Sequence, residues 1–200
     1  SYSLIHVSPY PYSVNRRLGF GSPTETDIFE LEKDFIQIYN KLNKSIFYKK
    51  YPAYRFSFDT ELSKIYSEYK NVKFINDLDY RYIRSAFDII VTGSPSSTFS
   101  WCLSANKPLI YFDSKIINPL INDEVRKRIQ KAVFYINIDN NSWKKILKKI
   151  LDRPYKVILK DWEIMREERK KFINEYIFSI DSNPGAKVAN YINNLIINDQ

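Results

Sequence analysis

The chain has 200 residues, of which 44% are hydrophobic and 27% charged, and its 31 Lys and Arg outnumber its 23 Asp and Glu to give a net charge of +8. A chain of this length encloses one substantial core but hardly two full domains, and no apolar run reaches the roughly 18 to 20 residues that cross a bilayer. With one cysteine and one histidine, it can form neither an internal disulfide framework nor an ordinary Cys/His zinc site, and it fits a reducing cytoplasm.

Short apolar runs alternate with helical patterns, which is typical of βαβ units and a parallel sheet. We predict strands at residues 2–8, 45–49, 72–75, 88–91, 109–112 and 133–136. We predict helices at residues 23–42, 60–69, 77–85, 95–106, 123–131, 142–151, 161–178 and 186–196. The expected fold class is α/β: a Rossmann-like parallel six-stranded sheet with flanking helices over residues 1–158, and a C-terminal helical tail over residues 159–200 that packs back on it.

Several helix ends carry local signals. Ser22, Pro23 and Glu25 form a capping box for the first helix. Asn122 is placed to open the helix that follows it. Asn106 precedes Lys-Pro and suits the left-handed position at which a helix ends.

The strand at residues 88–91 is almost wholly apolar and should lie at the sheet centre. It leads into a serine-rich turn, Gly93-Ser94-Pro95-Ser96-Ser97-Thr98. We expect Ser94 to cap the next helix, with Pro95 as its first residue. The amides of the next three residues would then lie in the first helical turn without intrahelical acceptors, and Gly93 would let the backbone approach a ligand.

Ligands of open parallel sheets bind beyond the carboxyl ends of the strands, so this turn is a candidate phosphate site. In the alternative, Ser94 only caps the helix and the remaining hydroxyls face solvent. The second strand ends at the same edge in Lys49-Lys50-Tyr51-Pro52, and the loop after the first strand contains Arg16 and Arg17, which could balance phosphate charge. In the alternative, the two lysines at the strand end are only solvated.

Two runs around the turn carry a family resemblance: Ala86-Phe87-Asp88-Ile89-Ile90-Val91-Thr92-Gly93-Ser94-Pro95-Ser96-Ser97-Thr98-Phe99 and Ala105-Asn106-Lys107-Pro108-Leu109-Ile110-Tyr111-Phe112. They resemble the C-terminal, donor-binding domain of GT-B glycosyltransferases. More narrowly, they are similar to bacterial surface and capsular polysaccharide transferases and to the related CDP-glycerol glycerophosphotransferases.

The resemblance implies a nucleotide-activated sugar as donor, with a CMP-linked sugar favoured. Lys50-Tyr51-Pro52 corresponds to a His-Pro element that contacts the donor nucleotide in these families, but Tyr51 replaces the histidine and cannot become a cation near pH 7. Trp101 stands where many retaining enzymes have a glutamate, which argues for an inverting enzyme. The acceptor domain and its general base lie N-terminal in such families, so we expect this chain to be part of a longer protein.

The sequence therefore predicts a cytoplasmic glycosyltransferase domain for surface polysaccharide or glycan synthesis, with no catalytic residue, metal or cofactor assigned. The expected donor contacts are Gly93, Ser94, Ser96, Ser97, Thr98, Lys50, Tyr51, Pro52, Arg16 and Arg17. The expected partners are a glycan or lipid-linked acceptor, an N-terminal GT-B domain and, because basic charge favours anionic surfaces, a membrane contacted peripherally; no specific nucleic acid is expected. The alternatives are a CDP-alcohol phosphotransferase domain and a non-catalytic nucleotide- or polyanion-binding module.

The remaining reactive residue types are expected to be structural. His6 belongs to the first strand and Cys102 to helix packing, while Asp77 is placed to cap a helix and Asp88 is a strand-edge residue. In the helix at residues 142–151 the lysines should be solvated on one face, opposite three buried residues, Ile146, Leu147 and Ile150.

Overall fold

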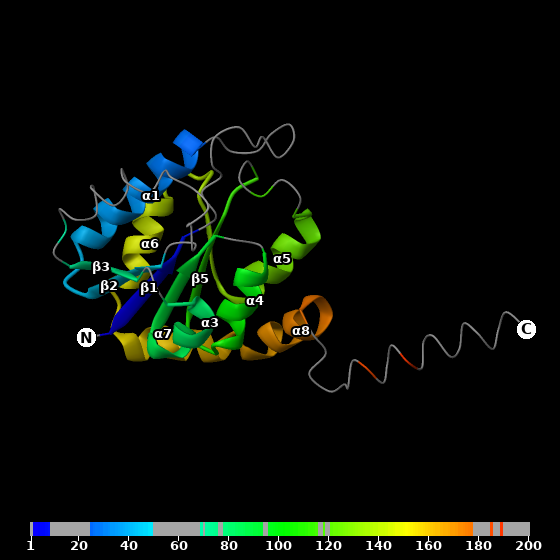
Figure 1. The fold of residues 1–200 in the computed structure, drawn as a ribbon. Coiled ribbons are helices and arrows are strands. Elements are labelled where there is room, and N and C mark those ends of the chain that lie inside the picture. Colours follow the sequence, from blue (N-terminus) through cyan, green and yellow to red (C-terminus); the bar gives the residue numbers. More distant parts are fainter. Residues whose placement is uncertain are drawn as a thin grey trace, which may run out of the picture.

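The computed structural model describes residues 2–8, 25–49, 69, 71–75, 78–93, 96–115, 118, 121–177, 185 and 189. Its strands form one sheet in the order β3-β2-β1-β4-β5-β6, and every neighbouring pair is parallel (Figure 1). The strands are β1 (Ser3–Val7), β2 (Ser45–Lys49), β3 (Val72–Ile75), β4 (Ile89–Thr92), β5 (Leu109–Asp113) and β6 (Phe134–Asn137). The predicted Rossmann-like parallel sheet is confirmed, and no predicted strand end differs from the observed one by more than one residue.

The strand order reverses between β1 and β4. The chain builds β1, β2 and β3 in one direction and then returns to place β4 on the other side of β1, so that Val7 and Thr92 lie side by side. Every residue of β4 and β5 is buried. The strand β4 lies beside β1 at the centre of the sheet, as its apolar run predicts, and the carboxyl ends of these two strands lie where α/β folds bind ligands.

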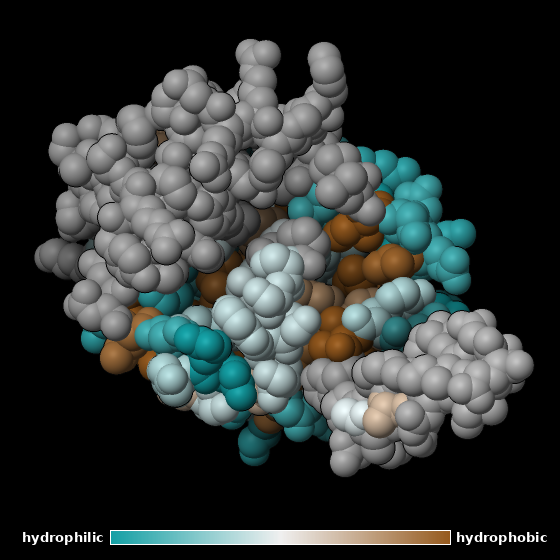
Figure 2. Space-filling model, turned by 45° about the vertical axis from the view of Figure 1, so that its right-hand side comes forward, coloured by the Kyte–Doolittle hydropathy of each residue, from teal (hydrophilic) through white to brown (hydrophobic). Residues whose placement is uncertain are grey.

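The helices cover both faces of the sheet. Figure 1 shows α1 and α6 together on one face and α4 and α5 on the other. The helices are α1 (Glu25–Asn40), α3 (Tyr80–Ile83), α4 (Ser97–Ser104), α5 (Asp123–Ala132), α6 (Trp143–Leu151), α7 (Tyr155–Ile164) and α8 (Arg166–Tyr176), with a 3₁₀ turn at Arg84–Ala86. Figure 2 shows hydrophilic side chains along the side that α5 covers and hydrophobic side chains in the hollow next to them.

Two predicted helix ends are confirmed, one by a hydrogen bond and one by its backbone conformation. The side chain of Asn122 accepts the amide of Val125 at 2.8 Å and opens α5. Asn106 follows the C-terminus of α4 with a φ of 49°, the left-handed conformation that asparagine tolerates better than most residues. The predicted cap at Ser22, residues 60–68 of the helix predicted at 60–69 and most of the helix predicted at 186–196 lie outside the described residues.

The single helix predicted at residues 161–178 is wrong. The structure has two helices that meet at Met165, and the first begins at Tyr155, directly after Pro154. The helix α8 is held against α7 by Arg169, whose guanidinium lies 3.5 Å from the centre of the Trp162 ring and donates to the Trp162 carbonyl at 2.9 Å. Burial lowers the pKa of Arg169 to about 10, so the side chain stays a cation at neutral pH.

Two other helix predictions need correction. The predicted helix at 77–85 is shorter, and its cap is Asp79, which accepts the Arg81 amide at 2.9 Å. In α6 the buried residues are Trp143, Leu147 and Leu151, whereas Ile146 is 39% exposed. These three residues are spaced four apart, so they form a narrow buried stripe along the side of α6 that faces α1. Ile146 lies outside that stripe.

The face under α1 contains a buried polar network around His6. Its Nδ1 lies 2.7 Å from the Tyr39 hydroxyl and its Nε2 lies 3.2 Å from Glu32 Oε2, which also accepts the Tyr48 hydroxyl at 2.7 Å. All four side chains are almost fully buried. The expectation that His6 is a core residue is confirmed, but the sequence did not reveal that its partners are a carboxylate and two tyrosines.

Cys102 is also a packing residue, as expected. It is fully buried in α4, and burial raises the pKa of its thiol to about 12. The thiolate, which is the reactive form of cysteine, is therefore not populated at neutral pH.

We expect Glu32→Leu to destabilise the domain by about 3 kcal/mol, because it leaves His6 and the Tyr48 hydroxyl buried without their shared acceptor. Urea unfolding measures the change. Glu30→Leu is the matched control: it lies on the same helix in an exposed ion pair with Lys33 and should leave the midpoint unchanged. Equal midpoints for the two variants would contradict a stabilising role of the network.

Candidate functional site

The turn after β4 packs tightly against β5. Gly93 is buried, and a Cβ at this position would lie 2.0 Å from Phe112 Cε2. No larger residue fits unless the Phe112 ring moves. The need for glycine therefore comes from the neighbouring strand, in addition to any approach by a ligand.

The predicted start of α4 at Ser94 and Pro95 is wrong. The helix begins at Ser97, and its cap is Ser96, whose extended backbone (φ −84°, ψ −164°) lets its hydroxyl accept the Thr98 amide at 3.4 Å and its carbonyl accept the Phe99 amide at 2.9 Å. One of the three amides expected to face a phosphate is thus already engaged. Because Ser96 and Ser97 are exposed, their side chains remain accessible at this end of the helix.

Of the other predicted contacts, most lie outside the described residues. This applies to Ser94, Lys50, Tyr51, Pro52, Arg16 and Arg17. Lys49 is described, and it is buried with its Nζ donating to the Ile75 carbonyl at 3.3 Å. The alternative, in which the lysines of this strand end are only solvated, is therefore wrong for Lys49, which lies against β3.

Trp101, at the position where the resemblance places a glutamate, is partly buried on α4. The Arg81 guanidinium lies 5.5 Å from its ring centre and is itself paired with Asp79 at 2.6 Å. The pKa of Asp79 is lowered by its hydrogen bonds to Arg81. Trp101 thus takes part in surface packing between α3 and α4 and offers no carboxylate for catalysis.

The turn after β5 contains a buried charge cluster that sequence analysis missed. Asp113, the last residue of β5, accepts Asn118 Nδ2 on Oδ1 at 2.8 Å, and on Oδ2 it accepts Arg126 Nε and the Tyr135 hydroxyl, each at 2.8 Å. Asp113 is 1% exposed and Arg126 is 7% exposed. A carboxylate at the end of an apolar strand and an arginine on the buried face of a helix were the two signals that could have revealed it.

Burial and the Asp113 carboxylate together set the protonation states in this cluster. Burial opposes the charge on Arg126, but its hydrogen bond and attraction to Asp113 outweigh that effect and raise its pKa. Burial, followed by the hydrogen bond to Asp113, also raises the pKa of Tyr135. Arg126 therefore stays charged and Tyr135 stays a hydrogen-bond donor at neutral pH.

Asn118 joins this cluster to the serine-rich turn. Its Nδ2 lies 3.4 Å from the Gly93 carbonyl, and its own carbonyl accepts Arg126 Nη2 at 2.6 Å. Arg126 also donates to the Ile121 carbonyl through Nη1. The turns that follow β4 and β5 are therefore held by one hydrogen-bond network, although they are distant in the sequence.

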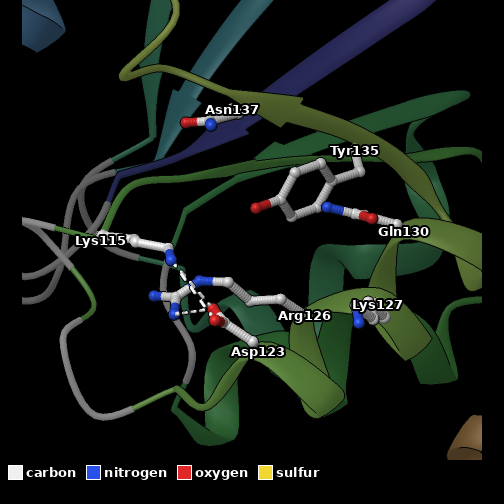
Figure 3. Close-up of a pocket in the computed structure, with 7 residues that line it drawn as sticks. All are labelled: Lys115, Asp123, Arg126, Lys127, Gln130, Tyr135 and Asn137. Carbon is white, nitrogen blue, oxygen red and sulfur yellow. Dashed lines mark hydrogen bonds and ion pairs between the residues drawn. The ribbon is translucent and has the colours of Figure 1, made fainter.

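A pocket of about 230 Å³ lies beside the cluster. Its lining residues come from the carboxyl ends of β5 and β6 and from α5: Lys115, Asp123, Arg126, Lys127, Gln130, Tyr135 and Asn137. Figure 3 shows Lys115, Asp123 and Arg126 grouped on one side and the Tyr135 hydroxyl pointing inward from β6. Lys115 Nζ lies 3.1 Å from Asp123 Oδ1, and its hydrogen bond to Asp123 lowers the pKa of that carboxyl group.

The pocket offers three cations and one carboxylate with amide and hydroxyl groups between them, which suits a polar, anionic or polyhydroxylated ligand. No sequence motif pointed to it, because its residues come from three elements. Among the residues that the structure describes, no group of three or more His, Cys, Asp or Glu side chains could hold a metal ion.

Comparison with known proteins supports the fold. No family model and no curated protein matches the chain. Among solved structures, it is similar to spinosyn forosaminyltransferase SpnP, with a TM-score of 0.53 and 11% identity over 94% of this chain and 44% of that one. It also matches the glycosyltransferase SnogD from Streptomyces nogalater with a TM-score of 0.42 and 12% identity, over 86% of this chain and 42% of that one.

The chain spans less than half the length of both glycosyltransferases. At 11% identity, the likeness to the forosaminyltransferase shows that the two proteins share a fold. The fold expected from the GT-B resemblance is thereby confirmed, while donor, acceptor and reaction remain to be argued from the site.

We expect Gly93→Ala to destabilise the domain by about 2 kcal/mol, because its methyl group overlaps the Phe112 ring. Adding Phe112→Leu, which removes the overlapping ring atoms, should reduce the cost of Gly93→Ala. A double-mutant cycle of urea midpoints measures this coupling. Additive effects would show that the two residues do not constrain one another.

We expect Arg126→Met to destabilise the domain by about 3 to 5 kcal/mol, because it leaves the Asp113 carboxylate buried without its cation. Lys127→Met removes the adjacent, exposed cation of the same pocket and should leave stability unchanged. Guanidinium unfolding distinguishes the two. A stable Arg126→Met variant would show that hydrogen bonds from Asn118 and Tyr135 suffice to hold the carboxylate.

Proposed function

We propose that this chain is the donor-binding part of a glycosyltransferase that uses a nucleotide-activated sugar. One observation carries the proposal: a turn with two exposed serines, Ser96 and Ser97, begins α4 at the carboxyl end of the buried strand β4, beside the reversal of strand order. The shared fold with a forosaminyltransferase supports the assignment of sugar transfer to this edge.

The donor phosphate would bind at the start of α4. The hydroxyls of Ser96 and Ser97 can donate to phosphate oxygens, and the positive end of the helix dipole adds a favourable potential. The hydrogen bond from Asn118 to Gly93 holds the turn in place before the ligand arrives, so little conformational entropy is lost on binding. Ser94, Lys50, Tyr51, Arg16 and Arg17 belong to the proposed donor contacts on the grounds of the resemblance.

The reaction would be displacement at the anomeric carbon by an acceptor hydroxyl. The bond to the donor phosphate breaks as the bond to the acceptor oxygen forms, and the serine turn stabilises the negative charge on the departing phosphate. The catalytic base and the acceptor site would come from a further domain, since this chain covers 44% of the forosaminyltransferase. We place the product in surface polysaccharide synthesis, and a cytidine nucleotide is the favoured leaving group.

Calorimetric titration of the chain with CMP, UDP and GDP tests the proposal. We expect binding of at least one nucleotide and a loss of about tenfold or more in affinity for Ser96→Ala combined with Ser97→Ala, because two hydrogen bonds to a charged group are lost. Ser104→Ala is the matched control, since this serine lies at the other end of α4 and donates to the Trp101 carbonyl.

Salt-sensitive binding of RNA without affinity for any mononucleotide would contradict the transferase proposal and favour a polyanion-binding module. Nucleotide binding that is unchanged in the double serine variant would place the nucleotide elsewhere on the domain.

A further inference from the structure

The outer face of α7 combines exposed lysines with exposed aliphatic side chains. The helix buries Ile158 and Trp162, which are four residues apart, against the rest of the domain. Helical spacing places Lys156, Val157, Lys160 and Ile164 on the opposite side. Val157 is 41% exposed and Ile164 is 72% exposed, so the structure presents two branched apolar side chains to solvent beside two lysines. We call these four residues the α7 face.

The charge of this region is unbalanced. Residues 143–164, which comprise α6, α7 and their link, contain seven Lys and Arg and three Asp and Glu, so they carry half of the net charge of +8. Each of the three acidic residues is already paired: Asp152 with Lys148, Asp161 with Arg153, and Glu163 with Arg166 at 3.9 Å.

Four lysines of the region have no acidic partner among the described residues. In the part of the chain that the structure describes, no ion pair involves Lys145, Lys149, Lys156 or Lys160. All four are exposed. The α7 face therefore complements a surface that is negatively charged and can also accept aliphatic side chains.

The α7 face belongs to the edge of the sheet opposite the serine-rich turn. The Tyr155 hydroxyl, at the start of α7, lies 3.5 Å from the carbonyl of Asp88, just before β4, and its ring lies 5.8 Å from that of Tyr2, just before β1. Figure 1 shows α7 below the amino ends of the strands. A surface bound there leaves the carboxyl edge of the sheet open to water.

We propose that the α7 face docks on the surface of an anionic phospholipid bilayer. Val157 and Ile164 would enter the boundary between head groups and acyl chains, while Lys156 and Lys160 would contact lipid phosphates. The exposed aliphatic residues favour a membrane over a nucleic acid, because single strands bind to aromatic platforms and the α7 face has none. Within the described ranges, no helix has both the length and the apolar character to cross a bilayer.

Co-sedimentation with vesicles of phosphatidylcholine and phosphatidylserine tests this inference. We expect the chain to bind these vesicles at low salt, to dissociate at high salt, and not to bind vesicles of phosphatidylcholine alone. Lys156→Glu with Lys160→Glu should weaken binding by at least about tenfold, since each lysine near an anionic surface contributes roughly fivefold. Val157→Ser with Ile164→Ser should weaken it without changing the net charge.

The matched control is Lys170→Glu with Lys171→Glu on α8, which changes the net charge by the same amount at two exposed lysines that pair within their own helix. This variant should bind vesicles nearly as well as the parent chain. Equal loss in the control, no binding to anionic vesicles, or unchanged binding after the serine substitutions would each overturn the proposal. RNA binding that requires Lys156 and Lys160 but neither aliphatic residue would overturn it in favour of a nucleic acid site.

The nucleotide titration separates this inference from the proposed function. The α7 variants should bind nucleotides as the parent chain does, because the α7 face and the serine-rich turn lie at opposite edges of the sheet. A chain that binds nucleotide but no vesicles would contradict the membrane inference alone.

Discussion

The buried carboxylate of Asp113 determines how the carboxyl edge of this domain is built. It is the last residue of β5, and its three hydrogen-bond donors come from the following loop, from α5 and from β6. An isolated buried charge is costly, and it is tolerated here because Arg126 and the two neutral donors satisfy both of its oxygens. This one group thereby ties Asn118, α5 and β6 to the end of β5, beside the pocket.

A second polar network lies under α1, around His6 and Glu32, on the other face of the sheet. His6 and Tyr48 are each the last residue but one of their strands, and Asp113 is the last of its strand. Buried polar groups are thus concentrated in the carboxyl half of the sheet. Directional hydrogen bonds fix positions more narrowly than apolar contacts do, so this half is well suited to hold a preformed binding site.

The two edges of the sheet offer different chemistry. The carboxyl edge has exposed hydroxyls at the start of α4 and a pocket lined by cations and amides. The amino edge is closed by aromatic packing between Tyr2 and Tyr155 and by hydrogen bonds that Ser3 donates to the Asp88 carboxylate, with α7 and its lysines outside. In the proposed transferase this separation would let the nucleotide donor and the membrane surface approach from opposite directions.

The sequence by itself determined the class of fold and most of its elements. The six strands, the cap at Asn122 and the left-handed turn at Asn106 depend on local periodicity and local hydrogen bonds, which neighbouring residues specify. The choice of Ser96 over Ser94 as the cap of α4 was decided by tertiary structure, because the local signal, a serine followed directly by Pro95, favours Ser94.

Tertiary structure also decided the Asp113 cluster, the buried position of Lys49 and the break at Met165, where neither proline nor glycine marks a helix end. Their partners are brought together only when the sheet and its helices assemble. Local patterns therefore located the candidate site at the turn after β4, and long-range contacts with β5 and α5 decided its shape.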